Sequence, residues 1–276
     1  MDLSIVIVSY NARAHLERCL ASLQAHPPAS SFEVVVVDNA STDGSAEAAA
    51  AFAGVRVIRS ATNTGFSVAN NIGIEATSGA HILLLNSDTT VPPGAINALL
   101  ERLGREPDVA VVGPRLVDGQ GRPELSFGPM ITPFNEWRQG RLVHGLASGD
   151  AAVVAQVEAM TRVEQRPDWV SGACLLVGRA DAEAVGLLDE RYFLYAEDVD
   201  FCAALRGLGR RILFTPDAQV VHLRGASGRS RPAATERAYR ESQLAFYAKH
   251  HPRWVPVLRV YLRLRGRLPA AASDRA

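Results

Sequence analysis

Leu3-Ser4-Ile5-Val6-Ile7-Val8-Ser9-Tyr10-Asn11 stands at the start of the chain. Its first six residues form a nearly continuous apolar run rich in β-branched residues, which is typical of a strand buried on both faces of a parallel sheet. A polar turn follows, and the helical spacing of the next leucines predicts a helix that Asn11 caps and that ends near Ala25. A strand followed at once by a helix is half of a βαβ unit, so this stretch predicts an α/β fold.

The same alternation continues through the next eighty residues or so. Strands are predicted at residues 3–8, 34–37, 55–58 and 82–85, and a further helix at residues 66–76. Strands separated by short helical segments indicate a mostly parallel, Rossmann-like sheet covered by helices.

Polar residues follow the ends of these strands. Ser9 and Asn11 follow the first strand, Asp38 and Asn39 the second, Asn63 the third, and Asn86 and Asp88 the fourth. Any one of them could be an ordinary turn residue. Four strands in succession nevertheless predict a ligand crevice, because ligands bind beyond the carboxyl ends of strands in open parallel sheets. No G-x-G-x-x-G motif and no P-loop is present, so the usual dinucleotide and ATP signatures are absent.

Tyr195-Ala196-Glu197-Asp198-Val199-Asp200-Phe201 places three carboxylates within four positions. Apolar residues recur at helical spacing from Val199, so Glu197 and Asp198 should lie in the first turn of a helix. Free backbone N–H groups there favour the charged form of a carboxyl group, so we expect low pKa values. The cluster predicts catalytic acids, and helix capping is the plainer alternative.

Composition narrows the class of protein. The chain has 276 residues, of which 47% are hydrophobic and 21% charged, enough for one large core or two fused halves. Its net charge of zero disfavours nucleic acid as a partner. Three widely spaced cysteines fit reduced thiols, and the first apolar run is too short for a signal peptide or a membrane span. We therefore expect a cytoplasmic location.

Six motifs, in order and at ordinary spacing, resemble those of family 2 glycosyltransferases, most closely the rhamnosyltransferase-like branch. They are IVIVSYN (5–11), VVDNASTDGS (36–45), NTGF (63–66) with NNIG (70–73), LNSD (85–88), GACL (172–175) and EDVD (197–200). The resemblance covers residues 3 to about 227. It implies a GT-A fold and transfer, with inversion, from a nucleotide-sugar donor to a hydroxyl of a saccharide or lipid-linked saccharide in cell-envelope polysaccharide synthesis.

The resemblance also implies a division of the chain. Residues 1–230 would form the catalytic domain, with a nucleotide-sugar-binding half at 1–113 and an acceptor-binding half at 114–230, and residues 231–276 a basic helical extension. In the donor half, Asp38 would meet the nucleotide base with Ser9 and Asn11 beside it. Asn63 would line the same nucleoside pocket.

A divalent metal, Mg²⁺ or Mn²⁺, follows from the resemblance as well. Asp88 corresponds to the last acid of the family's D-x-D motif, and Asn86 replaces the first acid. His222 resembles a histidine that some members offer as a further ligand, and its nitrogen would favour Mn²⁺. A hydrogen-bonded histidine at a strand end is the alternative. Arg224 belongs to an arginine cluster that could pair with the diphosphate or lie in a solvated loop.

On the acceptor side, the resemblance makes Asp198 the general base that takes the proton of the attacking hydroxyl. Glu197 would orient the acceptor, and Asp200 would support the site. Trp169, Gly172 and Tyr195 would bind the acceptor sugar. The proline-rich residues 114–168 are predicted to be long loops with short helices, of the kind that often carries function.

The tail is the basic part of the chain. Residues 249–276 contain seven lysines and arginines against one acid, and helices are predicted at 235–250 and 254–267. The second helix is amphipathic, so it could lie on the inner face of the plasma membrane or pack on the catalytic domain. Two other classes stay open at this stage: a nucleotidyltransferase, and a non-catalytic sugar-nucleotide-binding protein, which Asn86 slightly favours.

Overall fold

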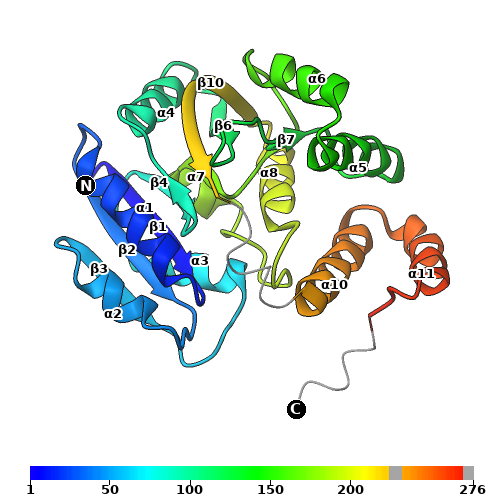
Figure 1. Ribbon diagram of the computed structural model, residues 1–276, viewed down its shortest axis with the longest axis horizontal. Coiled ribbons are helices and arrows are strands. Elements are labelled where there is room, and N and C mark those ends of the chain that lie inside the picture. Colours follow the sequence, from blue (N-terminus) through cyan, green and yellow to red (C-terminus); the bar gives the residue numbers. More distant parts are fainter. Residues whose placement is uncertain (224–231, 270–276) are drawn as a thin grey trace.

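The computed structural model describes residues 1–223 and 232–269 and shows an α/β fold built on one large sheet (Figure 1). The main sheet has eight strands in the order β3-β2-β1-β4-β9-β6-β10-β5, and β7 and β8 form a separate pair. The strands are β1 (Leu3–Ser9), β2 (Phe32–Asp38), β3 (Val55–Arg59), β4 (His81–Asn86), β5 (Thr89–Thr90), β6 (Val109–Val117), β7 (Phe127–Gly128), β8 (Trp169–Val170), β9 (Cys174–Gly178) and β10 (Arg211–His222).

The four strands predicted in the first half are confirmed as β1 to β4, and all four are parallel. β1 lies between β2 and β4, so Ser9 stands beside Asp38 and Val8 beside Asn86. The predicted strand-end residues therefore reach the same edge of the sheet. β9 runs antiparallel between β4 and β6, and its register places Cys174 beside Leu85.

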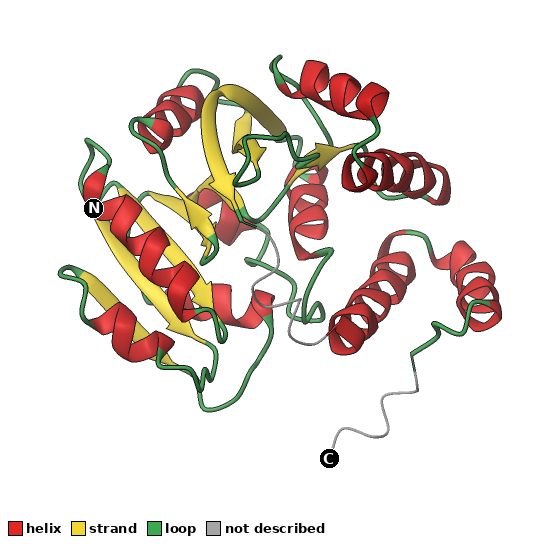
Figure 2. Ribbon diagram, in the orientation of Figure 1, coloured by secondary structure: helices red, strands yellow, loops and turns green. Residues whose placement is uncertain are grey.

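Helices cover both faces of the sheet (Figure 2). They are α1 (Arg13–Ala25), α2 (Ser45–Ala50), α3 (Phe66–Glu75), α4 (Ala95–Gly104), α5 (Pro133–Ser148), α6 (Ala151–Thr161), α7 (Arg179–Ala184), α8 (Glu197–Gly207), α10 (Pro232–His250) and α11 (Val255–Leu264), with the 3-10 turn η1 (Pro252–Trp254). Alternate side chains of each strand enter two apolar clusters. One cluster lies under α1, α2 and α4, and the other under α3, α7 and α8.

Residues 114–168, predicted to be long loops with short helices, contain two regular helices that are longer than predicted. α5 has 16 residues and α6 has 11. Thr132 caps α5 by accepting a hydrogen bond from the N–H of Asn135 at 3.2 Å, and Asp150 caps α6. Pro133 is harmless because it occupies the first turn of α5, where an N–H has no partner within the helix.

The predicted C-terminal helices are confirmed as α10 and α11, at the end of the molecule opposite β3 (Figure 1). Both pack into one apolar cluster with earlier parts of the chain. Phe246 and Tyr247 of α10 and Leu258 and Leu262 of α11 form one cluster with residues around the start of α8. No helix in the two described ranges has the length and apolar character needed to cross a bilayer.

Candidate active site

The first group of site residues lies where β1 and β2 end. Asp38 is only 4% exposed, and its Oδ2 accepts a hydrogen bond from the N–H of Ser41 at 3.2 Å. Its Oδ1 and the Oγ of Ser9 are both buried without a hydrogen-bond partner among the described residues. Buried polar atoms are normally paired. Two such atoms on neighbouring strands therefore indicate a place where a polar ligand completes the site.

Asn11 does not cap α1, contrary to the prediction. The helix begins after Ala12, and Asn11 adopts a left-handed backbone conformation with φ of 49°. Its side-chain carbonyl accepts hydrogen bonds from the N–H of Thr42 at 2.8 Å and from the Thr42 hydroxyl. The Asn11 side chain therefore bonds to a neighbouring loop and not to the N–H groups at the start of α1. It joins the turn after Ser9 to the loop after Asp38.

Asn39 organises the third loop, a role that sequence reasoning did not assign to it. It is 2% exposed, and its amide donates to Asn63 Oδ1 at 2.9 Å and to the carbonyl of Gly65 at 3.1 Å. Its side-chain oxygen accepts from the N–H of Thr64 at 2.9 Å. Asn63 is thereby held beside the strand end that carries Asp38. The only signal in the sequence was the position of Asn39 directly after the strand.

The predicted metal ligands Asp88 and His222 lie together. β5 pairs antiparallel with the end of β10, and this pairing brings His222 Nε2 to 3.2 Å from Asp88 Oδ1. The side-chain amide of Asn86 is 3.5 Å from the same ring nitrogen. Burial lowers the pKa of His222, but its hydrogen bonds to two carboxylates outweigh burial and raise that pKa to about 9.

The second of these carboxylates, Glu124, was not predicted. Its Oε2 lies 3.0 Å from His222 Nδ1. Carboxylates in this position orient histidine ligands of metals. Glu124 falls within the region predicted to be loops, and nothing in the local sequence distinguished it. The contact forms because β10 ends beside the segment that follows β6.

The donor types at this position suit a divalent cation. One carboxylate, one imidazole and one amide are the oxygen and nitrogen ligands that Mn²⁺ accepts. Within residues 1–223 and 232–269, no group of three or more His, Cys, Asp and Glu side chains is arranged to hold a metal ion. Arg224, which we expected beside the diphosphate, lies outside the described residues, as do Arg229 and Arg231.

The acidic cluster forms the first turn of α8, as predicted. Tyr195 and Ala196 precede it with φ angles of 70° and 68°, two consecutive left-handed residues that turn the chain sharply into the helix. Asp198 is half-buried and accepts two backbone hydrogen bonds. Oδ2 accepts from the N–H of Gly172 at 2.9 Å and Oδ1 from the N–H of Val199 at 2.8 Å.

The pKa values of Glu197 and Asp198 are raised, so the expectation of low values was wrong. Burial raises the pKa of Glu197 well above its ordinary range, and the adjacent Asp198 charge raises it further. Burial also raises the pKa of Asp198, although hydrogen bonds from Gly172 and Val199 oppose this effect. Glu197 is 5% exposed and its Oε2 has no hydrogen-bond partner among the described residues. The arrangement favours a proton on Glu197 and a charge on Asp198.

Asp200, the third acid, points toward the C-terminal helix instead. It is 2% exposed and accepts hydrogen bonds from Tyr192 Oη at 3.1 Å, Lys249 Nζ at 2.8 Å and His250 Nε2 at 2.6 Å. Lys249 and His250 end α10, so the contacts of the buried Asp200 with them fix α8 against α10. The supporting role expected of Asp200 thus has a structural basis, with partners that the sequence did not identify.

The three residues expected to contact the acceptor are not equally exposed. Gly172 touches Asp198, and Tyr195 is 40% exposed with its ring edge-on to that of Tyr239 in α10, 5.7 Å between centroids. Trp169 packs partly into the apolar clusters, and its Nε1 donates to the carbonyl of Pro129 at 2.9 Å. Gly172 and Tyr195 therefore lie at the start of α8, while Trp169 is held back by packing.

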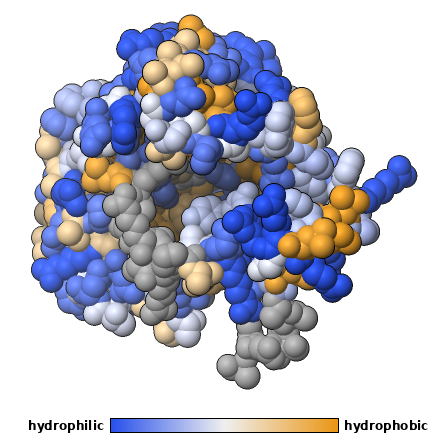
Figure 3. Space-filling model, turned by 45° about the vertical axis from the view of Figure 1, so that its right-hand side comes forward, coloured by the Kyte–Doolittle hydropathy of each residue, from blue (hydrophilic) through white to orange (hydrophobic). Residues whose placement is uncertain are grey.

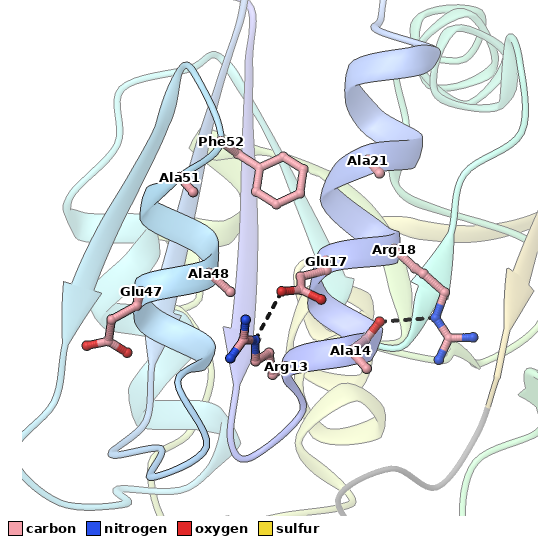
Figure 4. A pocket seen from close by; sticks show the side chains of 9 residues that line it. All are labelled: Arg13, Ala14, Glu17, Arg18, Ala21, Glu47, Ala48, Ala51 and Phe52. Atoms are coloured by element: carbon pink, nitrogen blue, oxygen red, sulfur yellow. Dashed lines mark hydrogen bonds and ion pairs between the residues drawn. The ribbon is translucent and has the colours of Figure 1, made fainter.

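An open hollow of about 580 Å³ lies elsewhere, between α1 and α2 (Figure 4). Arg13, Glu17, Glu47 and Phe52 are among the side chains that line it, and Arg13 forms an ion pair with Glu17 at 3.1 Å. None of the predicted site residues lines this hollow. Its cations and anions occur in similar number, so it has the character of ordinary surface.

Comparison with known proteins decides the family. The family model described as glycosyl transferase family 2 matches residues 4–157. The chain belongs to glycosyltransferase family 2. This family 2 chain is 32% identical over 306 aligned positions to N-acetylglucosaminyl-diphospho-decaprenol L-rhamnosyltransferase of Mycobacterium tuberculosis. The alignment covers 99% of this chain and 94% of that protein.

Other similar proteins agree with this assignment. A low-salt glycan biosynthesis hexosyltransferase of Haloferax volcanii is 24% identical over 209 positions, which cover 74% of this chain and 62% of that protein. Among solved structures, a mannosyltransferase from Pyrobaculum calidifontis in complex with GDP-Man and Mn²⁺ superposes with a TM-score of 0.61 and 18% identity. That superposition covers 95% of this chain and 69% of the other and confirms the GT-A fold.

The family resemblance and the α/β fold of GT-A type predicted from the sequence are both confirmed. The protein is a family 2 glycosyltransferase, so the nucleotidyltransferase and the non-catalytic binding protein are set aside.

Proposed function

We propose that this glycosyltransferase moves an L-rhamnosyl group from a nucleoside-diphosphate donor to a hydroxyl of a saccharide carried on a lipid diphosphate, with inversion at the anomeric carbon. The product would enter a cell-envelope polysaccharide. The rhamnosyltransferase similarity, which spans nearly the whole chain, supports the choice of sugar and acceptor. The observation that carries the chemistry is Asp198, a half-buried carboxylate aimed by two backbone N–H groups at the start of α8.

In this reaction the acceptor oxygen forms a bond to the anomeric carbon while the bond from that carbon to the diphosphate breaks. The electron pair of the breaking bond leaves with the nucleoside diphosphate. The proton of the acceptor hydroxyl passes to Asp198, which acts as general base. Each Asp198 oxygen accepts one backbone hydrogen bond and keeps a further lone pair for this proton. Glu197, which is buried and whose pKa burial raises, would orient the acceptor.

The donor would occupy the edge where β1, β2 and β4 end. We infer that the unpartnered atoms of Ser9 and Asp38 bind the nucleoside, with Asn11 and Asn63 holding the two loops around it. Arg224 is proposed for the diphosphate from the sequence alone. The donor half would span residues 1–113 and the acceptor half residues 114–230.

We infer that a divalent cation, Mn²⁺ or Mg²⁺, binds at Asp88 and His222 with the Asn86 amide beside it. When bound, it would supply positive charge that offsets the charge developing on the diphosphate. Glu124 would hold the His222 ring in place through its Nδ1. Because this site has one carboxylate where a D-x-D motif has two, Asp88 would contribute most of the affinity for the metal ion.

The acceptor would approach from the side of Tyr195 and Gly172, with Trp169 behind them. The turn before β9 would connect this side to the proposed metal ligands, because the N–H of Asn86 donates to the carbonyl of Ala173 at 2.9 Å and the N–H of Gly172 donates to Asp198. A lipid-carried acceptor would place the enzyme at the cytoplasmic face of the membrane. Residues 231–276 would then supply the peripheral contact.

The test is donor-dependent release of nucleoside diphosphate. Purified full-length protein is incubated with nucleoside-diphosphate-L-rhamnose, Mn²⁺ and a short-chain lipid-diphosphate N-acetylglucosamine. We expect release that requires the acceptor and yields a disaccharide with inverted anomeric configuration by NMR. Nucleoside-diphosphate-glucose serves as the matched donor control. Transfer of glucose at the same kcat/KM, or no transfer with either donor, would contradict the proposal.

A further inference from the structure

Helix α11 has two apolar faces, and only one of them is buried. Leu258 and Leu262 are 9% and 0% exposed and pack against Phe246 and Tyr247 of α10. The opposite face carries Trp254 of η1, Val257, Val260, Tyr261 and Leu264, which are between 48% and 83% exposed. The spacing of these residues, three and four positions apart, is that of a single helix face. A contiguous exposed apolar face of this kind marks an interaction surface.

Cations border this face, and anions are absent from the segment. Residues 251–269 contain five arginines and no Asp or Glu. At 100° per residue, Arg259 and Arg263 lie along one side of the apolar face and Arg265 along the other. All three are exposed, and Arg253, Arg259 and Arg263 form no ion pair within the described part of the chain. Figure 3 shows apolar surface next to strongly hydrophilic surface on the side that carries the C-terminal helices.

We propose that the exposed face of α11, from Trp254 to Leu264, docks the enzyme on the surface of an anionic lipid bilayer. Apolar side chains flanked by arginines bind such surfaces because the apolar groups enter the interface while the guanidinium groups meet lipid phosphates. A second copy of this chain is a poorer occupant, since a self-complementary contact would bring the two sets of arginines together. The proposal rests on the proposed function, in which the acceptor is held by a lipid.

The docking face is connected to the catalytic helix through two packed contacts. α11 packs on α10 through Leu258 and Leu262, and α10 holds Asp200 of α8 through Lys249 and His250. Docking would therefore fix the first turn of α8 at a set position relative to the lipid surface. Removing α11 altogether would expose the buried cluster, so point substitutions on its outer face are the sharper test.

The experiment compares three full-length proteins: wild type, Val260→Glu with Leu264→Glu, and Leu208→Glu. Leu208 is 57% exposed at the end of α8 and serves as the matched control. Co-sedimentation uses vesicles of phosphatidylcholine with phosphatidylglycerol, and vesicles of phosphatidylcholine alone. We expect wild type and the control to bind the anionic vesicles and to dissociate from them as the salt concentration rises. The double variant should bind at least about tenfold more weakly.

Activity separates this proposal from the proposed function. All three proteins should transfer equally to a soluble acceptor analogue, and the double variant alone should lose transfer to a vesicle-embedded acceptor. Wild type that ignores anionic vesicles, or a double variant that binds as wild type does, would overturn the docking proposal. Self-association of wild type that the double variant loses would assign the face to a second copy. Vesicle binding without transfer to either acceptor would instead reject the proposed function.

Discussion

The backbone N–H of Gly172 donates a 2.9 Å hydrogen bond to Oδ2 of Asp198, and thereby joins the turn before β9 to the first turn of α8. The bond fixes the direction of this half-buried carboxylate. The N–H of Val199 holds the other oxygen at 2.8 Å. An aimed carboxylate with free lone pairs is what a general base requires.

Replacing Asp198 by Asn should abolish transfer while donor binding persists. The amide keeps the shape but cannot accept the hydroxyl proton at neutral pH, so we expect kcat to fall by at least about 10²-fold. Steady-state kinetics and donor titration by calorimetry measure the two effects. Asp217→Asn, at an exposed position, is the matched control. An Asp198→Asn enzyme with most of its activity would remove Asp198 from this role.

Replacing Glu197 by Gln should stabilise the protein increasingly as pH rises. The pKa of Glu197 is raised in the folded state, so above about pH 4.3 the unfolded state loses its proton first and stability falls until the folded-state pKa is passed. Gln cannot titrate and removes this loss. The difference in Tm between Glu197→Gln and wild type should therefore increase from pH 4.5 to pH 7. A difference independent of pH would show that Glu197 is charged in the fold.

Replacing Asp88 by Ala should weaken Mn²⁺-dependent donor binding more than Asn86→Ala does, because only Asp88 supplies a formal charge. We expect a loss of about tenfold or more for Asp88→Ala, and EDTA should mimic it in wild type. Asn86→Asp, which restores the missing acid, should tighten Mn²⁺ binding. Isothermal titration with and without metal gives these affinities. Equal effects of the two alanine variants would indicate that arginines hold the diphosphate.

Replacing Gly65 by Ala should lower the free energy of unfolding far more than the same change at Gly172. A Cβ on Gly65 would lie 2.5 Å from the carbonyl oxygen of Phe193, and φ is +88°. A cost of about 1–3 kcal/mol is expected from the backbone strain alone. A Cβ on Gly172 would meet Asp198 Cβ at 3.4 Å, an ordinary contact. Urea unfolding should separate the two variants, and equal stability would show that the Phe193 loop moves easily.

Replacing Asp200 by Ala should destabilise the fold and not merely slow the reaction. Asp200 is buried and pairs with the exposed Lys249 and the half-buried His250, so the loss should lie below the about 3–5 kcal/mol of a fully buried ion pair. Thermal unfolding should show a clear fall in Tm relative to the exposed control Asp217→Ala. An unchanged Tm would mean that α10 is not held to α8 through this cluster.

The sequence by itself determined the first four strands of the sheet and the family. β1, β2 and β4 coincide with apolar runs because a strand buried on both faces needs little besides apolar residues, and the shorter apolar run of β3 forms a half-buried edge strand. α8 begins at Glu197, where an acidic first turn precedes helically spaced apolar residues. The six motifs identified the family from local pattern alone. The positions of Asp38, Asn86 and Asp88 at or just after strand ends were enough to place them at one edge of the sheet.

Only the tertiary structure decided how the site residues behave. Glu124 meets His222 although 98 residues separate them, and Asp200 meets Lys249 and His250 from the far end of the chain. Burial reverses the pKa shift that a helix start predicts for Glu197. One side of α11 joins the core while the other stays exposed, which the amphipathic pattern left open. Local patterns fix helices and strands because backbone hydrogen bonds are local or repeat regularly. Burial, pairing and charge depend on which distant segments pack together.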